Sequence, residues 1–263
     1  MGKVTMNNKE NYYPVKVLEK SFLILDLLHQ NSSPISITEI SKKLSFYTST
    51  VYRILCTLKS GGFVEQDPKT QKYLLGMKFV ELGASKLQNI NFIKEILPYL
   101  RELKERFNET VHLGVLRDNE ILYLAKEESS RTIRMFSRIG NRAPIYCTGL
   151  GKIILAFLPL KERNEILNNI KLVAYEKNTI TNRKILEDEL STIRKKGFAL
   201  DNEEHEKDVF CIAVPVFNFE KKIIAAISIS IPKFRINSQK LKKIKAALID
   251  TSNVISKNLM LTK

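Results

Sequence analysis

The chain has 263 residues and a net charge of +15 at pH 7, with 44% hydrophobic and 27% charged residues. This composition excludes a disordered chain, and because no apolar run approaches the ~20 residues of a membrane span, we expect no membrane partner. The widely separated Cys56, Cys147 and Cys211 form neither a CxxC pair nor an even-numbered disulfide set, so we expect a cytoplasmic protein. The positive charge fits a polyanionic partner without identifying one.

Three helices are predicted within the first 60 residues. Apolar residues recur at helical spacing over residues 17–30, and a turn-forming run of Asn, Ser and Pro ends this helix. A short helix follows at about residues 38–44, with Thr38 as its predicted N-cap. The third helix covers about residues 48–60 and ends at a glycine pair, as is common at helix C-termini.

Two short strands are predicted directly after these helices. Residues 63–66 and 72–75 are rich in strand-forming side chains, and the intervening residues 67–70 have a turn composition. Three helices followed by a small β-hairpin are typical of a winged helix-turn-helix domain.

The rest of the chain is predicted to adopt an α+β fold. Helices are expected at residues 77–91 and 93–107, with Pro98 kinking the second helix or lying in its first turns. Beyond residue 108, alternating patterns predict strands at 110–116, 121–126, 133–137, 210–217 and 223–231, and helices at 152–158, 161–168, 182–196 and 238–259. Helices mixed with antiparallel hairpins favour the α+β class.

The third predicted helix has a face suited to DNA. At about 100° per residue, one side collects the apolar residues Val51, Ile54, Leu55 and Leu58, and the opposite side collects Ser49, Tyr52, Arg53 and Cys56. Arginine can pair with guanine, and hydroxyl groups can bind bases or phosphates. A solvated surface helix is the simpler interpretation in isolation, but the surrounding motif favours a recognition helix. The predicted DNA-binding residues are Thr38, Tyr47, Thr48, Ser49, Thr50, Tyr52 and Arg53.

A series of short motifs extends over nearly the whole chain from residue 17 onward. They are ISKKL at 40–44, STVYRIL at 49–55, GFV at 62–64, YLLG at 73–76, GNRAP at 140–144, CTGLGK at 147–152, TIT at 179–181, GFA at 197–199, DNEEH at 201–205, CIAVPV at 211–216 and AISIS at 226–230. In this order they resemble the IclR-type transcriptional regulators, and the number of unrelated motifs makes the resemblance specific.

The resemblance implies a division of the chain into three parts. Residues 13–76 would form the winged helix-turn-helix domain and residues 77–91 a linker helix. Residues 92–263 would form an effector-binding and oligomerisation domain with a GAF/profilin-like antiparallel sheet. The implied partners are double-stranded operator DNA, a small organic acid as effector, and further copies of the chain in a homodimer or homotetramer. No cofactor, metal or catalytic residue is expected.

Two features of the C-terminal half suit an effector pocket. Residues 148–151 precede an apolar helix, so their glycines would let a ligand approach the backbone and the helix start would offer N–H groups to an anion. On strand 223–231, Ser228 and Ser230 lie opposite the isoleucines, where a solvent-facing polar side is the alternative. The resemblance implies a pocket lined by Met135, Ala143, Gly149, Leu150, Asp201, Val209, Cys211, Ser228 and Ser230. Asp201 would accept a hydrogen bond from a ligand hydroxyl or orient its loop.

Two other functions stay open on the sequence alone. The acidic run 201–208, with His205 and either His112 or Cys211, could hold a metal in an enzyme that uses the helical domain for docking. Adjacent residues rarely converge on one ion, so a solvated acidic loop is the simpler interpretation, and no GxSxG, P-loop, HExxH or dinucleotide motif is present. A constitutive architectural or RNA-binding protein is the third hypothesis.

Overall fold

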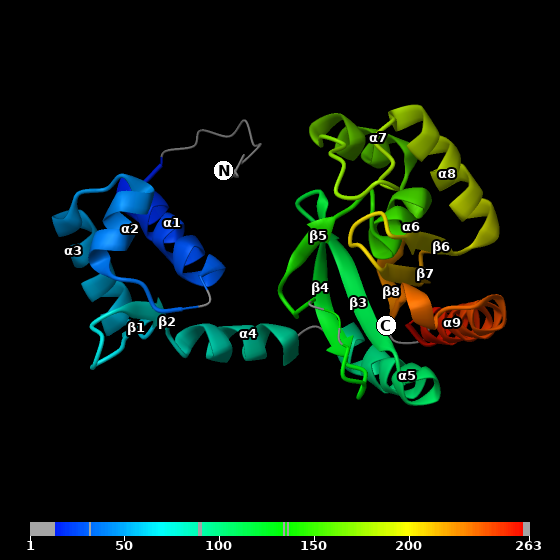
Figure 1. Cartoon of the computed structure of the whole chain (residues 1–263), viewed down its shortest axis with the longest axis horizontal. Coiled ribbons are helices and arrows are strands. Elements are labelled where there is room, and N and C mark those ends of the chain that lie inside the picture. The colour runs from blue at the N-terminus through cyan, green and yellow to red at the C-terminus, as the bar shows by residue number, and fades with distance from the viewer. Residues whose placement is uncertain (1–13, 32, 89–90, 134, 136, 260–263) are drawn as a thin grey trace. The chain divides into compact units, whose positions relative to one another are not determined.

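The computed structural model describes residues 14–31, 33–88, 91–133, 135 and 137–259 (Figure 1). The chain divides into two compact units, one within residues 1–89 and the other within residues 90–263. The described part of the chain contains no helix long and apolar enough to cross a membrane.

The N-terminal unit is a winged helix-turn-helix, as predicted. Its elements are α1 (Lys16–Gln30), α2 (Ile37–Leu44), α3 (Thr48–Ser60), the strands β1 (Val64–Gln66) and β2 (Tyr73–Leu75), and α4 (Lys78–Gln88). The two strands pair antiparallel to form the wing. Apolar residues from the first three helices and the wing make one core, which consists of Ile24, Leu28, Ile35, Ile40, Val51, Ile54, Leu55, Val64 and Tyr73.

The start of α2 differs from the sequence prediction. Ser36, not Thr38, is the N-cap: its hydroxyl oxygen accepts the N–H of Glu39 at 3.3 Å, and the Glu39 carboxylate accepts the N–H of Ser36 at 2.8 Å. This reciprocal pair satisfies two donors at once. Thr38 lies inside the first turn and is exposed.

The C-terminal unit is built on a six-stranded antiparallel sheet. The strand order is β5-β4-β3-β8-β7-β6. The strands are β3 (Thr110–Arg117), β4 (Glu120–Glu127), β5 (Arg142–Pro144), β6 (Ala199–Asn202), β7 (Val209–Phe217) and β8 (Ile223–Pro232). The helices are α5 (Asn91–Phe107), α6 (Gly149–Phe157), α7 (Leu160–Asn169), α8 (Arg183–Lys196) and α9 (Ser238–Leu259), and the short 3-10 helix η1 (Lys233–Arg235) follows β8.

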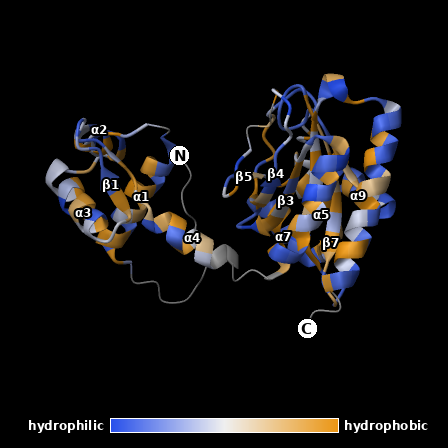
Figure 2. Ribbon diagram, turned by 90° about the horizontal axis from the view of Figure 1, so that it is seen from below, coloured by the Kyte–Doolittle hydropathy of each residue, from blue (hydrophilic) through white to orange (hydrophobic). Residues whose placement is uncertain are grey.

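Helices cover both faces of this sheet (Figure 1). Helices α5 and α9 pack on one face, where the isoleucines of β8 join a large apolar core. Helices α6 and α8 pack on the other face, over a second core that includes Ala213 and Ala226. In Figure 2, hydrophobic residues run along β7, whereas α5 and α9 carry both hydrophobic and hydrophilic residues. The alternation of side chains along β8 therefore places its isoleucines in the core under α5 and α9, and Ser228 and Ser230 on the opposite face.

Several predicted boundaries are wrong or incomplete. Residues 133, 135 and 137 do not lie in a strand, while residues 134 and 136 of that predicted strand are outside the described part of the chain. Strands β5 and β6 were not predicted, because three and four residues give no reliable alternation. Helix α6 begins at Gly149, earlier than the predicted residue 152, and Pro98 lies inside α5.

Candidate nucleic-acid interface and effector pocket

The exposed face of α3 carries most of the residues predicted to contact DNA. Tyr47 is 85% exposed directly before the helix and Tyr52 is 54% exposed within it. Thr48, Ser49 and Arg53 are also exposed, whereas Thr50 is half-buried. Because Val51, Ile54 and Leu55 anchor the opposite side in the core, this face is turned outward, as the wheel predicted. Thr38 is exposed on α2.

The start of α3 has backbone donors available for a phosphate. Tyr47 precedes the helix without a capping side-chain hydrogen bond, so the first N–H groups depend on solvent or a ligand. The Ser41 hydroxyl lies 3.2 Å from the Thr48 hydroxyl and donates to the Phe46 carbonyl, which fixes the turn between α2 and α3. On the helix surface, the neighbouring Cys56 thiol raises the pKa of Tyr52, which keeps its hydroxyl a proton donor.

The C-terminal unit contains a pocket between the sheet and the start of α6. The pocket is narrow, and the space in it that the centre of a water molecule could occupy is about 30 Å³. Its lining residues are His112, Tyr123, Met135, Ser137, Thr148, Gly149, Leu150, Asp201, His205, Glu206, Val209, Cys211, Ser228 and Ser230. Eight of the nine residues predicted for the effector site are among them. The ninth, Ala143, is buried on β5 in the core beneath α6 and does not line the pocket.

The sheet forms the polar floor of the pocket. His112 on β3 pairs with Ser228 on β8, and Cys211 on β7 pairs with Ser230. The Ser230 hydroxyl lies 3.1 Å from the Cys211 thiol and 3.4 Å from His112 Nδ1. Ser228 is only 2% exposed, so the alternative of a solvent-facing polar side is wrong for this strand.

The segment after β4 supplies Met135 and Ser137 to the pocket. The Lys126 ammonium donates to the backbone carbonyls of both residues, at 2.9 Å and 2.8 Å. His112 Nε2 and the Ser137 hydroxyl share a hydrogen bond of 2.6 Å. Residues 135 and 137 are therefore tied to Lys126 and His112, which are paired across β4 and β3.

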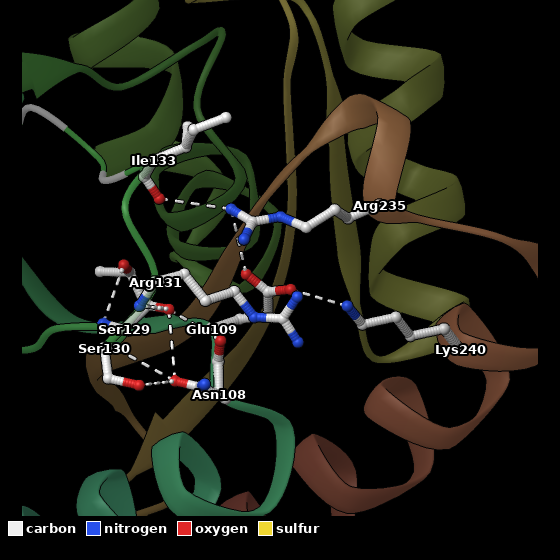
Figure 3. A network of polar contacts seen from close by, with 9 residues as sticks. Asn108, Glu109, Ser129, Ser130, Arg131, Ile133, Arg235 and Lys240 are labelled. Carbon is white, nitrogen blue, oxygen red and sulfur yellow. Dashed lines mark hydrogen bonds and ion pairs between the residues drawn. The ribbon is translucent and has the colours of Figure 1, made fainter.

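Further polar contacts hold the same segment where it leaves β4 (Figure 3). The N–H and hydroxyl of Ser130 donate to the Asn108 side chain at 3.1 Å and 3.0 Å. Arg235 donates to the Ile133 carbonyl at 3.3 Å and lies 3.7 Å from the buried Glu109 carboxylate. Lys240 contacts the same carboxylate at 2.7 Å. This network joins η1 and α9 to the segment that carries Met135.

The start of α6 lies close to the sheet because its residues are small. The Gly151 N–H donates to the N-cap Thr148 hydroxyl at 3.1 Å. A Cβ at Gly151 would lie 2.0 Å from the Ile145 carbonyl oxygen, so only glycine fits there. A Cβ at Gly149 would lie 3.3 Å from Ala213. By helix geometry, the N–H groups of Gly149 and Leu150 have no partner within the helix and can serve a ligand.

A buried ion pair lies beside this helix start. Lys152 is 1% exposed, and its ammonium contacts the Glu204 carboxylate and, at 3.8 Å, that of Glu189. Asp201 accepts the Glu204 N–H at 2.9 Å, which orients the loop after β6. Because Asp201 and Glu204 are buried, the acidic run is not the fully solvated loop that the sequence favoured. No local pattern indicates this ion pair, since Lys152 stands at the start of an apolar run.

Burial controls the ionisation of several groups in the pocket. It lowers the pKa of His112 to about 3, with a contribution from Lys126, so this imidazole is neutral. It raises the pKa of Asp201 to about 7, although backbone N–H groups of Glu204 and His205 oppose the rise. It also raises the pKa of Cys211 well above its ordinary value, which makes this thiol an inert neutral group.

Six residues in the pocket lining were absent from the predicted set. They are His112, Tyr123, Ser137, Thr148, His205 and Glu206. The period-two pattern of strand 110–116 predicts the face on which His112 lies. It does not predict that Ser228 is its neighbour, because the pairing of β3 with β8 is long-range. Among the described residues, no group of three or more His, Cys, Asp or Glu side chains is arranged to hold a metal ion.

Comparison with known proteins identifies the family. Residues 17–68 match the IclR helix-turn-helix domain, and residues 84–257 match the family described as bacterial transcriptional regulator IclR C-terminal. The second match alone covers more than half of the chain. The chain belongs to the IclR family. It is therefore a DNA-binding transcriptional regulator with an effector-binding C-terminal domain, and the enzyme hypothesis is wrong.

Individual relatives agree with this assignment. The IclR-family chain is 40% identical over 237 residues to the HTH-type transcriptional regulator KdgR of Escherichia coli K12, covering 90% of each protein. The crystal structure of the Thermotoga maritima IclR matches with a TM-score of 0.79 and 34% sequence identity. This match covers 94% of this chain and all of the other. An IclR homologue from Microbacterium hydrocarbonoxydans, crystallised with 4-hydroxybenzoate, shares the fold at 22% identity, with a TM-score of 0.82 and the same coverage.

Proposed function

We propose that this regulator binds a small organic acid in the pocket beside α6 and that occupancy changes operator binding by the N-terminal domain. The observation that carries the proposal is the convergence of buried hydroxyl groups and a helix N-terminus on one cavity. Ser228 and Ser230 come from β8, and the free N–H groups of Gly149 and Leu150 come from α6. A carboxylate can accept from all four donors.

The apolar part of the pocket limits the rest of the molecule. Met135, Leu150 and Val209 line the cavity together with the polar floor. Because these side chains narrow the cavity, we expect a compact hydroxy- or keto-acid or a small aromatic acid. The Microbacterium homologue was crystallised with 4-hydroxybenzoate, which is a small aromatic acid.

The DNA-binding part of the proposal rests on α3. Its exposed face would enter the major groove of a double-stranded operator, with Arg53 at a base edge and Tyr52 and Ser49 at bases or phosphates. The uncapped start of the helix, next to Tyr47 and Thr48, would face a phosphate. Thr38 and Thr50 complete the proposed contact set.

Exposed apolar residues support assembly into a homodimer or homotetramer. Val17, Leu18 and Phe22 on α1 are each more than half exposed, although they are large and apolar. On α4, Val80 and Leu82 are exposed to a similar degree. Such patches commonly mark protein contacts, and a second copy of the chain would pair two recognition helices for an inverted repeat with half-sites about 34 Å apart.

We also propose the division of labour implied by the sequence. Residues 13–76 would bind DNA, and residues 92–263 would bind effector and mediate oligomerisation, to which the exposed apolar residues of α1 and α4 would add contacts. Helix α4, within the linker 77–91, is the segment of chain between them and would transmit the change.

A thermal-shift screen of small carboxylates on the full-length protein tests the effector class. An acid present at 100 times its dissociation constant should stabilise the protein by about 2.7 kcal/mol. Calorimetry on the double variant Ser228→Ala/Ser230→Ala should then show weaker binding, by roughly 1.5–3 kcal/mol for each charge-assisted bond lost. Unchanged affinity in this variant would place the effector site elsewhere.

A further inference from the structure

The charges around the pocket are unusual for a site that holds an anion. Asp201 and Glu206 both line it, and the lining residues that the structure describes include neither lysine nor arginine. The Lys152 ammonium beside the start of α6 is already engaged by Glu204 and Glu189, and the Lys126 ammonium is engaged by the backbone carbonyls of Met135 and Ser137. A carboxylate entering beside an ionised Asp201 would therefore meet a like charge at short range in a poorly solvated space.

We propose that Asp201 binds the effector's carboxylate as the neutral acid, so that the effector enters the pocket together with one proton. The proposal rests on the proposed function, because it requires an acidic effector. Where Asp201 is ionised before binding, the proton comes from solvent. The neutral carboxyl then donates a hydrogen bond to the effector carboxylate, and the complex carries one negative charge instead of two.

The surroundings of Asp201 make it the group that takes the proton. Its side chain accepts the Glu204 N–H rather than pairing with a cation, and burial sets its pKa to about 7. Glu204, by contrast, holds the Lys152 ammonium directly. A proton on Asp201 therefore costs little near neutral pH, while a proton on Glu204 would break a buried ion pair.

The other groups around Asp201 do not titrate near neutral pH in a way that could replace it. From β4, β7 and the turn before α6, burial raises the pKa of Tyr123, Cys211 and Cys147, so these groups stay neutral. Burial lowers the pKa of His112 on β3 and of His205 in the loop, so both imidazoles stay uncharged. The charged side chains that the structure describes around the pocket are Lys126 on β4, Lys152 on α6, Glu189 on α8, and Glu204 and Glu206 in the loop after β6. Burial raises the pKa of Glu204, but its contact with the Lys152 ammonium opposes the rise.

The proposal predicts a particular pH dependence of effector affinity. Below pH 7 Asp201 already holds its proton, so affinity should be nearly constant. Above pH 7 the proton must be taken from solvent, and affinity should fall by about tenfold for each pH unit.

The experiment uses the full-length protein and a panel of pyruvate, glycolate, benzoate and 4-hydroxybenzoate. The acid that stabilises the protein most at pH 6 is titrated by calorimetry from pH 6 to pH 9. Each titration is run in buffers of different ionisation enthalpy, which gives the number of protons taken up. We expect almost none at pH 6 and close to one at pH 8.5.

Three variants assign the proton to a residue. Asp201→Asn keeps an oxygen for the Glu204 N–H and offers a permanent donor, so we expect it to bind at pH 8.5 with no pH slope and no proton uptake. His112→Gln and His205→Gln remove the other titratable imidazoles of the pocket and should keep the slope.

The possible results separate this proposal from the proposed function. If an acid binds to the wild-type protein at pH 8.5 without proton uptake, the proposed protonation of Asp201 is overturned, while the acidic effector of the proposed function stands. This measurement needs no variant. A slope that disappears in a histidine variant would overturn the assignment to Asp201. If no acid of the panel binds at pH 6, the acidic effector itself is contradicted.

Discussion

At the scale of single residues, burial decides what the acidic groups of the pocket beside α6 can do. Asp201 and Glu204 stand three positions apart, yet one accepts backbone N–H groups and the other holds Lys152. Because burial raises the pKa of Asp201 to about 7, the folded chain binds a proton more tightly than the unfolded chain does.

This difference predicts how the stability of the ligand-free protein depends on pH. Between about pH 4 and pH 7 the folded state holds the Asp201 proton while the unfolded state releases it, so the raised pKa makes stability fall as pH rises. Thermal unfolding from pH 4.5 to pH 8.5 should therefore show wild type losing stability relative to Asp201→Asn across this window. A constant difference between the two proteins would contradict the raised pKa.

Arg53 is the residue on which DNA selectivity is expected to depend most. Its replacement by Ala should weaken cognate operator binding by roughly 1–3 kcal/mol and relax the preference at one base pair. Gel-shift titrations on the operator and on single-base variants measure both effects. Lys59→Ala, on the same helix in its last turn, is the matched control for loss of a positive charge. Equal losses for both variants on every sequence would rule out base recognition by Arg53.

Single residues also show where prediction from sequence ends. Alternation along one strand was enough to place Ser228 and Ser230 together, because the two serines lie two residues apart on the same strand. His112 joins them only through the pairing of β3 with β8, which no local pattern encodes. Lys152 was missed for the same reason, since its partner Glu204 is 52 residues away.

At the scale of elements, apolar periodicity predicted the helices well, whereas the predicted N-cap of α2 was wrong. Predicted and observed limits of α3 agree because its two faces differ clearly in polarity and glycines follow it. The short strands β5 and β6 were missed, since pairing with longer neighbours defines them. At the start of α2, Ser36 and Thr38 lie two residues apart, and Glu39 completes with Ser36 the S-x-x-E pattern of a capping box, a signal in the sequence that the prediction of Thr38 overlooked.

The cap can be tested by comparing two similar substitutions. Ser36→Ala removes the acceptor for the Glu39 N–H and should destabilise the N-terminal unit by about 0.5–2 kcal/mol. Thr38→Ala removes a hydroxyl from the same turn without a capping role and should have a much smaller effect. Urea unfolding of both variants gives the comparison, and equal losses would show that the capping box contributes nothing measurable.

At the scale of the whole molecule, the exposed apolar face of α1 is the feature that favours contact with a second copy of the chain. Leu18→Glu combined with Phe22→Glu places charges on this face and should shift the protein toward monomer, weakening operator binding through loss of the second half-site. Light scattering and gel shifts measure the two effects. Val173→Glu, an equally exposed apolar position in the C-terminal unit, should change neither. A wild-type monomer that stays monomeric on operator DNA would rule out the assembly.

The most direct test of the account is whether occupancy of the C-terminal pocket changes DNA affinity. Operator binding is measured by fluorescence anisotropy while the acid selected by the thermal-shift screen is titrated, for wild type, Ser228→Ala/Ser230→Ala and the control Ser252→Ala, whose buried hydroxyl bonds Pro215 outside the pocket. We predict a 5- to 150-fold change of operator affinity in wild type, about 1–3 kcal/mol, and the same response in Ser252→Ala. The double variant should bind the operator normally without acid and respond only at concentrations at least about tenfold higher. An identical response in all three proteins would contradict sensing through this pocket.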